Sequence, residues 1–119
     1  MPTATLDLTK KHCRPGEGGV PKLTEAQLPE YLAAAPQWKR SSDGRCIRRE
    51  WKVKDFAAAL DFFRRVGDVA EQEDHHPDLH LTGYRNVAIE LTTHALGGLS
   101  ENDFILAAKI DRLPVELKT

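Results

Sequence analysis

Apolar residues are spaced in two ways through residues 23–113, at helical intervals and in strict alternation. The order of these two patterns along the chain is the feature that most constrains the fold. Apolar side chains repeat at helical spacing in residues 54–73, and they alternate in the flanking segments 47–53 and 84–95. A helix buries one stripe of side chains and a strand buries one face, so each period predicts its own element. A chain that switches between both periods is expected to pack helices against a sheet.

A first helix is predicted after residue 23. Thr24 and Gln27 have the spacing of a capping box, and the apolar residues that follow repeat at helical spacing. Pro29 fits poorly inside a helix and favours a start later than Thr24. Pro36 ends the helix.

A β-hairpin is predicted next, with strands at residues 38–40 and 47–53 around the turn-rich residues 41–44. The long helix over residues 54–73 follows, and the sequence His75-His76-Pro77 ends it, because the residue before a proline leaves helical geometry. Trp51 and Phe63 are expected in the core. The apolar stripe expected to face the sheet consists of Phe56, Ala59, Leu60, Phe63, Val66 and Ala70.

A second hairpin and a last helix complete the pattern. Strands at residues 78–82 and 84–95 flank Gly83, which offers a tight turn. Ser100 to Asp103 resembles a capping box with an acidic third position, and the helix that it starts stops before Pro114. The buried face of the second strand is expected to carry Val87, Ile89 and Leu91.

The predicted order is therefore α-β-β-α-β-β-α. This is an α+β fold in which three helices pack on one face of a four-stranded antiparallel sheet. The folded domain is expected to span residues 23–119. Residues 1–22 contain clustered Pro and Gly, so they are expected to form an irregular arm or a poorly ordered tail.

Composition limits the classes of function. The chain has 119 residues, enough for one domain, and its formal net charge of −1 excludes the strongly basic balance of a general nucleic-acid binder. Its apolar runs are too short to cross a membrane, and no secretory signal is expected at its start, so the predicted location is cytoplasmic. Two cysteines, Cys13 and Cys46, are too few for a disulfide framework or a Cys-based zinc site.

Histidines are the residues best suited to chemistry. His75, His76 and His94 lie at the ends of predicted elements, and imidazole is the side chain that exchanges protons near neutral pH. Each one taken alone is most simply a solvated or helix-capping residue. A metal site is not expected, because adjacent histidines usually point apart and no His-x-His or helical His-x3-His pair supports one.

These residues together resemble a known signature. The pterin-4a-carbinolamine dehydratase family has a pattern that this chain resembles at Glu71-x3-His75-His76-Pro77-x6-Tyr84-x9-His94-x8-Asp103, and the likeness runs from about Leu23 to Leu113. The arm around Cys13 looks like the N-terminal extension of plant- and protist-type members. Animal members carry Trp where this chain has Leu79.

The resemblance implies a hydro-lyase that removes water from 4a-hydroxytetrahydrobiopterin to give quinonoid dihydropterin, in the recycling of the pterin used by aromatic amino acid hydroxylases. No metal or organic cofactor is implied. His75 and His94 would be general acids, and His76 would bind the pterin and assist proton removal. These three would bind the substrate together with Asp74, Pro77, Thr92 and Thr93, and the supporting residues would be Glu71, Tyr84 and Asp103.

One geometric condition follows from the predicted strand. If its side chains alternated as far as residue 94, His94 would face away from Val87, Ile89 and Leu91. The three imidazoles are therefore expected to meet at the end of the sheet or on its other face.

The resemblance also implies partners and leaves alternatives. A homo-oligomer, dimer or tetramer, is expected through an uncovered edge strand, with functional coupling to a pterin-dependent hydroxylase and with no nucleic acid or membrane as partner. One alternative is a non-catalytic dimerisation cofactor or protein-interaction module. The other is a pterin-related role in folate or molybdenum-cofactor metabolism.

Overall fold

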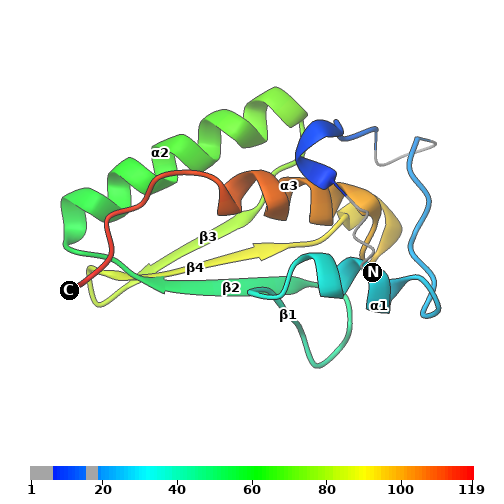
Figure 1. Cartoon of the computed structure of the whole chain (residues 1–119), viewed down its shortest axis with the longest axis horizontal. Helices are drawn as coiled ribbons and strands as arrows, with labels where there is room; N and C mark the ends of the chain where they lie inside the picture. Colours follow the sequence, from blue (N-terminus) through cyan, green and yellow to red (C-terminus); the bar gives the residue numbers. More distant parts are fainter. Residues whose placement is uncertain (1–6, 16–18) are drawn as a thin grey trace.

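The computed structural model describes residues 7–15 and 19–119. Within them, three α-helices and a four-stranded antiparallel sheet confirm the predicted fold class, and the strands lie in the order β1-β2-β4-β3. Two 3-10 turns, η1 (Leu8–Lys10) and η2 (His94–Leu96), accompany them. The helices and strands in chain order are α1 (Leu28–Ala34), β1 (Lys39–Arg40), β2 (Ile47–Lys52), α2 (Phe56–Glu73), β3 (Asp78–Thr82), β4 (Asn86–Leu91) and α3 (Glu101–Asp111), as Figure 1 shows.

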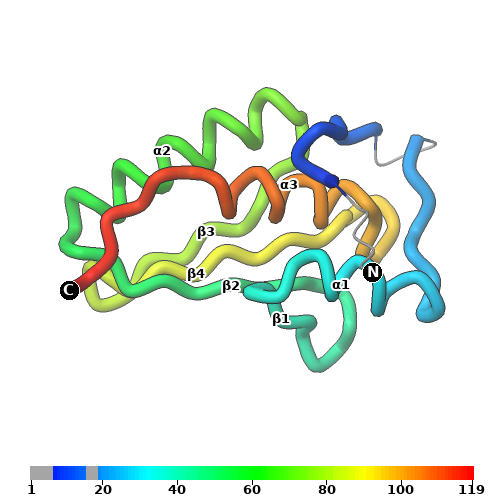
Figure 2. Tube along the Cα trace, viewed as in Figure 1, coloured from blue at the N-terminus to red at the C-terminus, as the bar shows by residue number. Residues whose placement is uncertain are grey.

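The core lies between the sheet and the helices, and the tube in Figure 2 shows α2 and α3 running along the sheet. The ring of Phe62 in α2 packs edge-on against Trp51 in β2, with centroids 5.0 Å apart. The ring of Tyr31 in α1 lies 5.3 Å from that of Phe104 in α3, which joins the helices to each other. Alternation assigns the inner faces of the strands, where these residues are buried: Ile47, Trp51, Val53, Val87, Ile89 and Leu91. Arg49, predicted on the same face of β2, is only partly buried.

The opposite face of the sheet is polar. His80 on β3 lies there, and its Nε2 is 3.2 Å from the Glu90 carboxylate on β4. Arg48 on β2 donates to the same carboxylate at 2.7 Å. His80 therefore belongs to a different surface from the apolar core, although it follows His76 by only four residues.

The long helix α2 covers nearly the predicted residues, and Ala59, Val66 and Ala70 of the predicted stripe are buried, but the rest of the stripe is not. Phe56 and Leu60, predicted in the core, are about half exposed, and Phe63 is only partly buried. Phe62 is fully buried instead, and the stripe that contains it ends at the buried Glu73. The segment has apolar residues on two adjacent stripes, so helical spacing alone does not decide which one the sheet covers.

The strand β4 ends at Leu91, four residues before its predicted end. The Thr93 N–H donates to the carbonyl of Gly98 at 2.9 Å, and the two residues form an isolated antiparallel bridge. Between them His94–Leu96 forms η2, and Gly97 follows with a left-handed φ of 64°. The chain reverses here to enter α3, so the condition that alternation placed on His94 does not apply.

The reciprocal bonds predicted for Thr24 and Gln27 form, but they lie in a turn before α1, whose N-cap is Gln27. The Thr24 N–H donates to the Gln27 side chain at 2.9 Å, and the Gln27 N–H donates to the Thr24 hydroxyl at 3.2 Å. The helix itself begins at Leu28, with Pro29 in its first turn, where a proline costs no helical hydrogen bond. The later start that Pro29 favoured is confirmed.

Residues 7–15 of the N-terminal arm contain η1 and are otherwise irregular, and they pack against the domain. Leu8 in η1 is buried in the core cluster, and residues 12–14 bind the end of α2 and the start of α3. The boundary between an irregular arm and the folded domain stays a prediction, and residues 1–6 and 16–18 lie outside the described residues. Among the described residues, no helix has the length and apolar character needed to cross a membrane.

Candidate active site

His75 follows directly on the C-terminal end of α2. Asp74 has a left-handed φ of 52°, and the His75 N–H donates to the Ala70 carbonyl at 3.2 Å. This bond is the long one of a Schellman motif, which ends a helix with a defined backbone. Pro77 then keeps His76 out of helical geometry. His75 is consequently held at the junction of α2 and β3.

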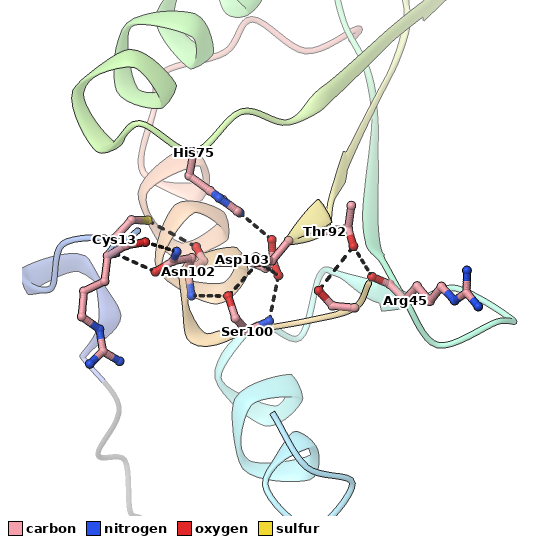
Figure 3. Close-up of polar contacts among 10 residues, drawn as sticks. Cys13, Arg45, His75, Thr92, Ser100, Asn102 and Asp103 are labelled. Atoms are coloured by element: carbon pink, nitrogen blue, oxygen red, sulfur yellow. Dashed lines mark hydrogen bonds and ion pairs between the residues drawn. The ribbon is translucent and has the colours of Figure 1, made fainter. Parts of the chain in front are cut away.

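Asp103, in the first turn of α3, is the partner of His75. One carboxylate oxygen, Oδ1, lies 2.7 Å from His75 Nε2 (Figure 3). The other, Oδ2, accepts the Ser100 N–H and the Thr93 hydroxyl, both at 2.9 Å. The Ser100 side chain accepts in turn from the Asn102 N–H, which completes the predicted capping box. The same carboxylate therefore caps α3 and holds an imidazole.

These contacts decide which nitrogen of His75 carries a proton. An ionised carboxylate only accepts hydrogen bonds, so Nε2 is the donor to Asp103. Nδ1 makes no hydrogen bond to any residue of the described part of the chain. The His75 side chain is 11% exposed and the Asp103 side chain 0%. An imidazole with one nitrogen bound to a buried carboxylate and the other free is arranged to transfer a proton.

His76 has its own carboxylate, but in water. Its Nε2 lies 2.6 Å from Glu71, one turn back on α2. The exposed fractions of the two side chains are 55% and 77%. The structure therefore brings Glu71 to His76 and Asp103 to His75, a pairing that the resemblance did not specify. Only the second pair is shielded from solvent.

The predicted residues at the end of β4 divide into three settings. Thr93 is buried, and its hydroxyl joins Ser100 and Asp103. The Thr92 hydroxyl instead donates to the Arg45 carbonyl at 2.6 Å, which ties the end of β4 to the loop before β2 (Figure 3). His94 is exposed in η2, directly after Thr93.

Three further predicted residues contribute backbone geometry or lie elsewhere. Asp74 supplies the left-handed helix end, and Pro77 leads into β3. Tyr84 lies in the β3–β4 turn, where it and Gly83 have positive φ values of 56° and 55°. Five strand residues, roughly 17 Å, separate this turn from His75. The expectation that Tyr84 lies on a strand is wrong, and its supporting role stays a prediction from the resemblance.

Sequence reasoning gave no site role to Ser100 or Asn102, which lie beside this pair, and it did not foresee that Glu73 binds the N-terminal arm. Ser100 was noted only as a helix cap, yet its hydroxyl lies 2.7 Å from that of Thr93. Glu73 and Asn102 are buried and bind the N-terminal arm. Nothing in the sequence indicates that Asn102 is buried. The position of Glu73, two residues before His75, is a signal that could have drawn attention to it. Among residues 7–15 and 19–119, no group of three or more His, Cys, Asp or Glu side chains is placed to hold a metal ion.

The fold and the site define an α+β protein that presents histidine–carboxylate pairs where α2, β4 and α3 meet, a class suited to proton transfer. The comparison with protein families is more specific. The chain belongs to the family described as pterin 4 alpha carbinolamine dehydratase, whose model matches residues 21–113. The resemblance found in the signature is thereby confirmed.

Individual relatives agree with this membership. A mitochondrial pterin-4-alpha-carbinolamine dehydratase 2 from Arabidopsis thaliana is 50% identical over 92% of this chain, which spans 60% of that longer protein. A putative pterin-4-alpha-carbinolamine dehydratase from Halorhodospira halophila is 46% identical, over 91% of this chain and 98% of its own. A crystal structure of a transcriptional coactivator/pterin dehydratase from Brucella melitensis has a TM-score of 0.71 and 34% identity, over 76% of this chain and 96% of that one.

Proposed function

We propose that this chain is a hydro-lyase that removes water from a 4a-hydroxytetrahydropterin, such as 4a-hydroxytetrahydrobiopterin, and releases a quinonoid dihydropterin. The observation that carries the proposal is the His75–Asp103 pair, nearly buried and bonded at 2.7 Å. Membership of the dehydratase family supplies the substrate class.

The chemistry needs two proton transfers. The bond between C4a and its hydroxyl oxygen breaks, and the oxygen leaves as water after accepting a proton. A ring N–H gives up its proton, and the remaining electron pair forms the new ring double bond. Atoms and charge balance without an oxidant or reductant. General acid–base assistance of this kind is typically worth about 10²–10⁴-fold in rate.

The residues take roles that their settings support. His75, with Nε2 bound to Asp103, transfers a proton from Nδ1 to the departing oxygen when the ring is an imidazolium, which the Asp103 carboxylate stabilises. His94, exposed directly after Thr93, acts as a second general acid. His76 binds the pterin and accepts the ring proton. Glu71 stabilises the charged imidazolium that His76 then becomes. Asp74, Pro77 and Thr92 shape the backbone around the pterin.

The decisive experiment follows the ultraviolet change as a chemically generated 4a-hydroxytetrahydropterin loses water. The wild-type chain is compared with a double variant carrying His75→Ala and His76→Ala. We expect the wild type to exceed the buffer rate and the double variant to lose about 10²-fold or more of that acceleration. His80→Ala is the matched control, because His80 lies on the polar face of the sheet and contacts Glu90.

Three outcomes are informative. Loss of rate in the double variant with His80→Ala unchanged supports the proposal. A wild-type chain no faster than buffer contradicts it. A loss of equal size in His80→Ala contradicts the assignment of the site, since that substitution leaves the His75–Asp103 pair intact.

The partners are also proposals. The resemblance implies that the substrate arises when pterin-dependent aromatic amino acid hydroxylases turn over, so we propose functional coupling to such a hydroxylase. We propose a homo-oligomer formed through β3, since β3 is an outer strand of the sheet and most of its side chains are exposed. The cytoplasmic location stays a prediction, and the Arabidopsis relative is named as mitochondrial.

A second candidate function rests on one observation. The Brucella melitensis neighbour is named both as a transcriptional coactivator and as a pterin dehydratase. A protein-interaction role beside or instead of catalysis is therefore the alternative, and it predicts a partner-binding activity that survives the double histidine substitution. The role in folate or molybdenum-cofactor metabolism stays a prediction from the resemblance.

A further inference from the structure

The N-terminal arm binds the last turn of α2 through one carboxylate. The Cys13 N–H donates to Glu73 Oε1 at 2.7 Å, and His12 Nδ1 lies 3.0 Å from Glu73 Oε2. Lys109, from the last turn of α3, donates to the same Oε2. The Glu73 side chain is only 5% exposed. A carboxylate from the end of α2 is thus shared between the arm and α3.

The arm binds the first turn of α3 through one amide. The Arg14 N–H donates to Asn102 Oδ1 at 3.0 Å, and Asn102 Nδ2 donates to the Arg14 carbonyl at 2.6 Å. The Cys13 thiol also lies 3.6 Å from the Asn102 carbonyl (Figure 3). Asn102 is 1% exposed, so both of its polar atoms depend on the arm. Removing such a partner leaves a buried polar group unpaired, which costs about 1–3 kcal/mol.

These two attachment points flank the proposed catalytic pair. Glu73 precedes His75 by two residues, and Asn102 directly precedes Asp103. Cys13 and Arg14 are neighbours in the arm, so a single dipeptide holds both sides of the His75–Asp103 bond. Separate tethers would allow the two helix ends to move independently, whereas one shared tether fixes the distance between them.

We propose that residues 12–14 form a strap that sets the geometry of the His75–Asp103 pair, and that Glu73 and Asn102 are positioning residues for the reaction. The consequence for catalysis rests on the proposed function, whereas the consequence for His75 geometry does not. Glu73 and Asn102 act through His75 and Asp103 and do not touch the substrate.

The charges of the strap suit a permanent attachment. Burial raises the pKa of Glu73, but hydrogen bonds from Lys109, the Cys13 N–H and His12 outweigh it and lower that pKa to about 2. Burial, followed by the nearby charge of Glu73, raises the pKa of the Cys13 thiol to about 12. A charged carboxylate and a neutral thiol are therefore both maintained at neutral pH. The thiol also becomes a reporter, because only the thiolate reacts with alkylating reagents.

The test uses Asn102→Ala in the full chain. Alanine is compatible with the first turn of α3 and removes both side-chain bonds to Arg14 while Asp103 stays in place. We expect faster alkylation of Cys13, measured by mass spectrometry against Cys46 as an internal reference. We also expect the His75 Nε2–H resonance in proton NMR to broaden, because its bond to Asp103 is no longer held at one distance.

Activity is measured on the same samples. A displaced catalytic group costs about 10–10²-fold in rate, so we expect kcat for dehydration to fall by about tenfold with KM changed less than about twofold. Glu73→Gln is the second variant, chosen because it keeps an acceptor for the Cys13 N–H, and we expect a smaller fall. Arg112→Ala is the control, because it removes an arm contact to Thr9 at 3.5 Å but leaves both attachment points.

The outcomes separate the two proposals. Faster Cys13 alkylation in Asn102→Ala with an unchanged His75 resonance and kcat overturns the strap, since the arm then detaches without consequence. An effect of Arg112→Ala as large as that of Asn102→Ala also overturns it. If the wild-type chain shows no dehydration, the proposed function fails, and the His75 resonance alone still supports or overturns the strap.

Discussion

The two histidine–carboxylate pairs have the same chemical groups and nearly the same length, yet they differ in what surrounds them. The His75–Asp103 bond is 2.7 Å long, and its carboxylate also binds Ser100 and Thr93 inside the protein. The His76–Glu71 bond is 2.6 Å long, and both of its side chains are more than half exposed. Water and salt weaken an exposed ion pair, whereas a buried one keeps most of its electrostatic interaction.

The difference teaches how one loop can supply two kinds of histidine. A pair fixed inside the protein presents a ring in one orientation, with one nitrogen committed. A pair on the surface exchanges its partner for solvent or ligand at little cost. The first setting suits proton transfer to a defined atom, and the second suits contact with a ligand that enters and leaves.

The largest expected effect comes from Asp103→Asn. Both oxygens of the Asp103 carboxylate accept hydrogen bonds, three in all. An amide has only one oxygen, so its NH2 group would face at least one hydrogen-bond donor and leave it without an acceptor. We expect kcat/KM for dehydration to fall by about 10²-fold, because His75 loses its orienting acceptor. We also expect a loss of about 1–3 kcal/mol in the free energy of unfolding, measured with urea. Unchanged activity in a folded variant would contradict the view that the buried pair matters more for catalysis than the exposed one.

The second prediction extends the comparison to Glu73, a buried carboxylate held by the arm. Its folded pKa is about 2 against an ordinary value of 4.5, so its contribution to stability is complete above pH 4.5 and lost as the pH falls toward 2. The difference between these two pKa values corresponds to a contribution of roughly 3 kcal/mol to the free energy of unfolding. We expect the stability of Glu73→Gln to fall less steeply than that of the wild type over this range. Parallel curves in acid would contradict the prediction.

The smallest expected effect comes from Glu71→Gln. Exposed ion pairs are worth about 0–1 kcal/mol, so stability should change by less than that. We expect kcat/KM to change by less than about threefold, because His76 keeps access to solvent. Thermal unfolding and the dehydration assay measure both quantities. A loss as large as that of Asp103→Asn would show that exposure does not separate the two pairs.

Local signals in the sequence predicted much of this architecture. The capping residue Ser100 and the turn at Gly83 depend on neighbours a few residues away, and both lie in the structure as predicted. The signature also named the four residues of the two histidine–carboxylate pairs, although it did not say which carboxylate meets which histidine. The strand alternation in β2 and β4 was sufficient to assign their buried faces.

The remainder depended on contacts between distant residues. The bonds from the arm to Glu73 and Asn102 join residues 60 and 88 positions apart, and no periodicity encodes them. Whether Phe62 or Phe63 of α2 is buried depends on which side of the helix packs against the sheet. The early end of β4 depends on the bridge between Thr93 and Gly98, which tertiary structure imposes on a sequence suited to continue as a strand.

The central claim is that catalysis is concentrated in the buried pair. The most direct measurement compares kcat/KM of Asp103→Asn and Glu71→Gln in the same dehydration assay, with one preparation of the 4a-hydroxytetrahydropterin. The account predicts that the loss in Asp103→Asn exceeds that in Glu71→Gln by about 30-fold or more. Equal losses, or a larger loss in Glu71→Gln, would contradict the account.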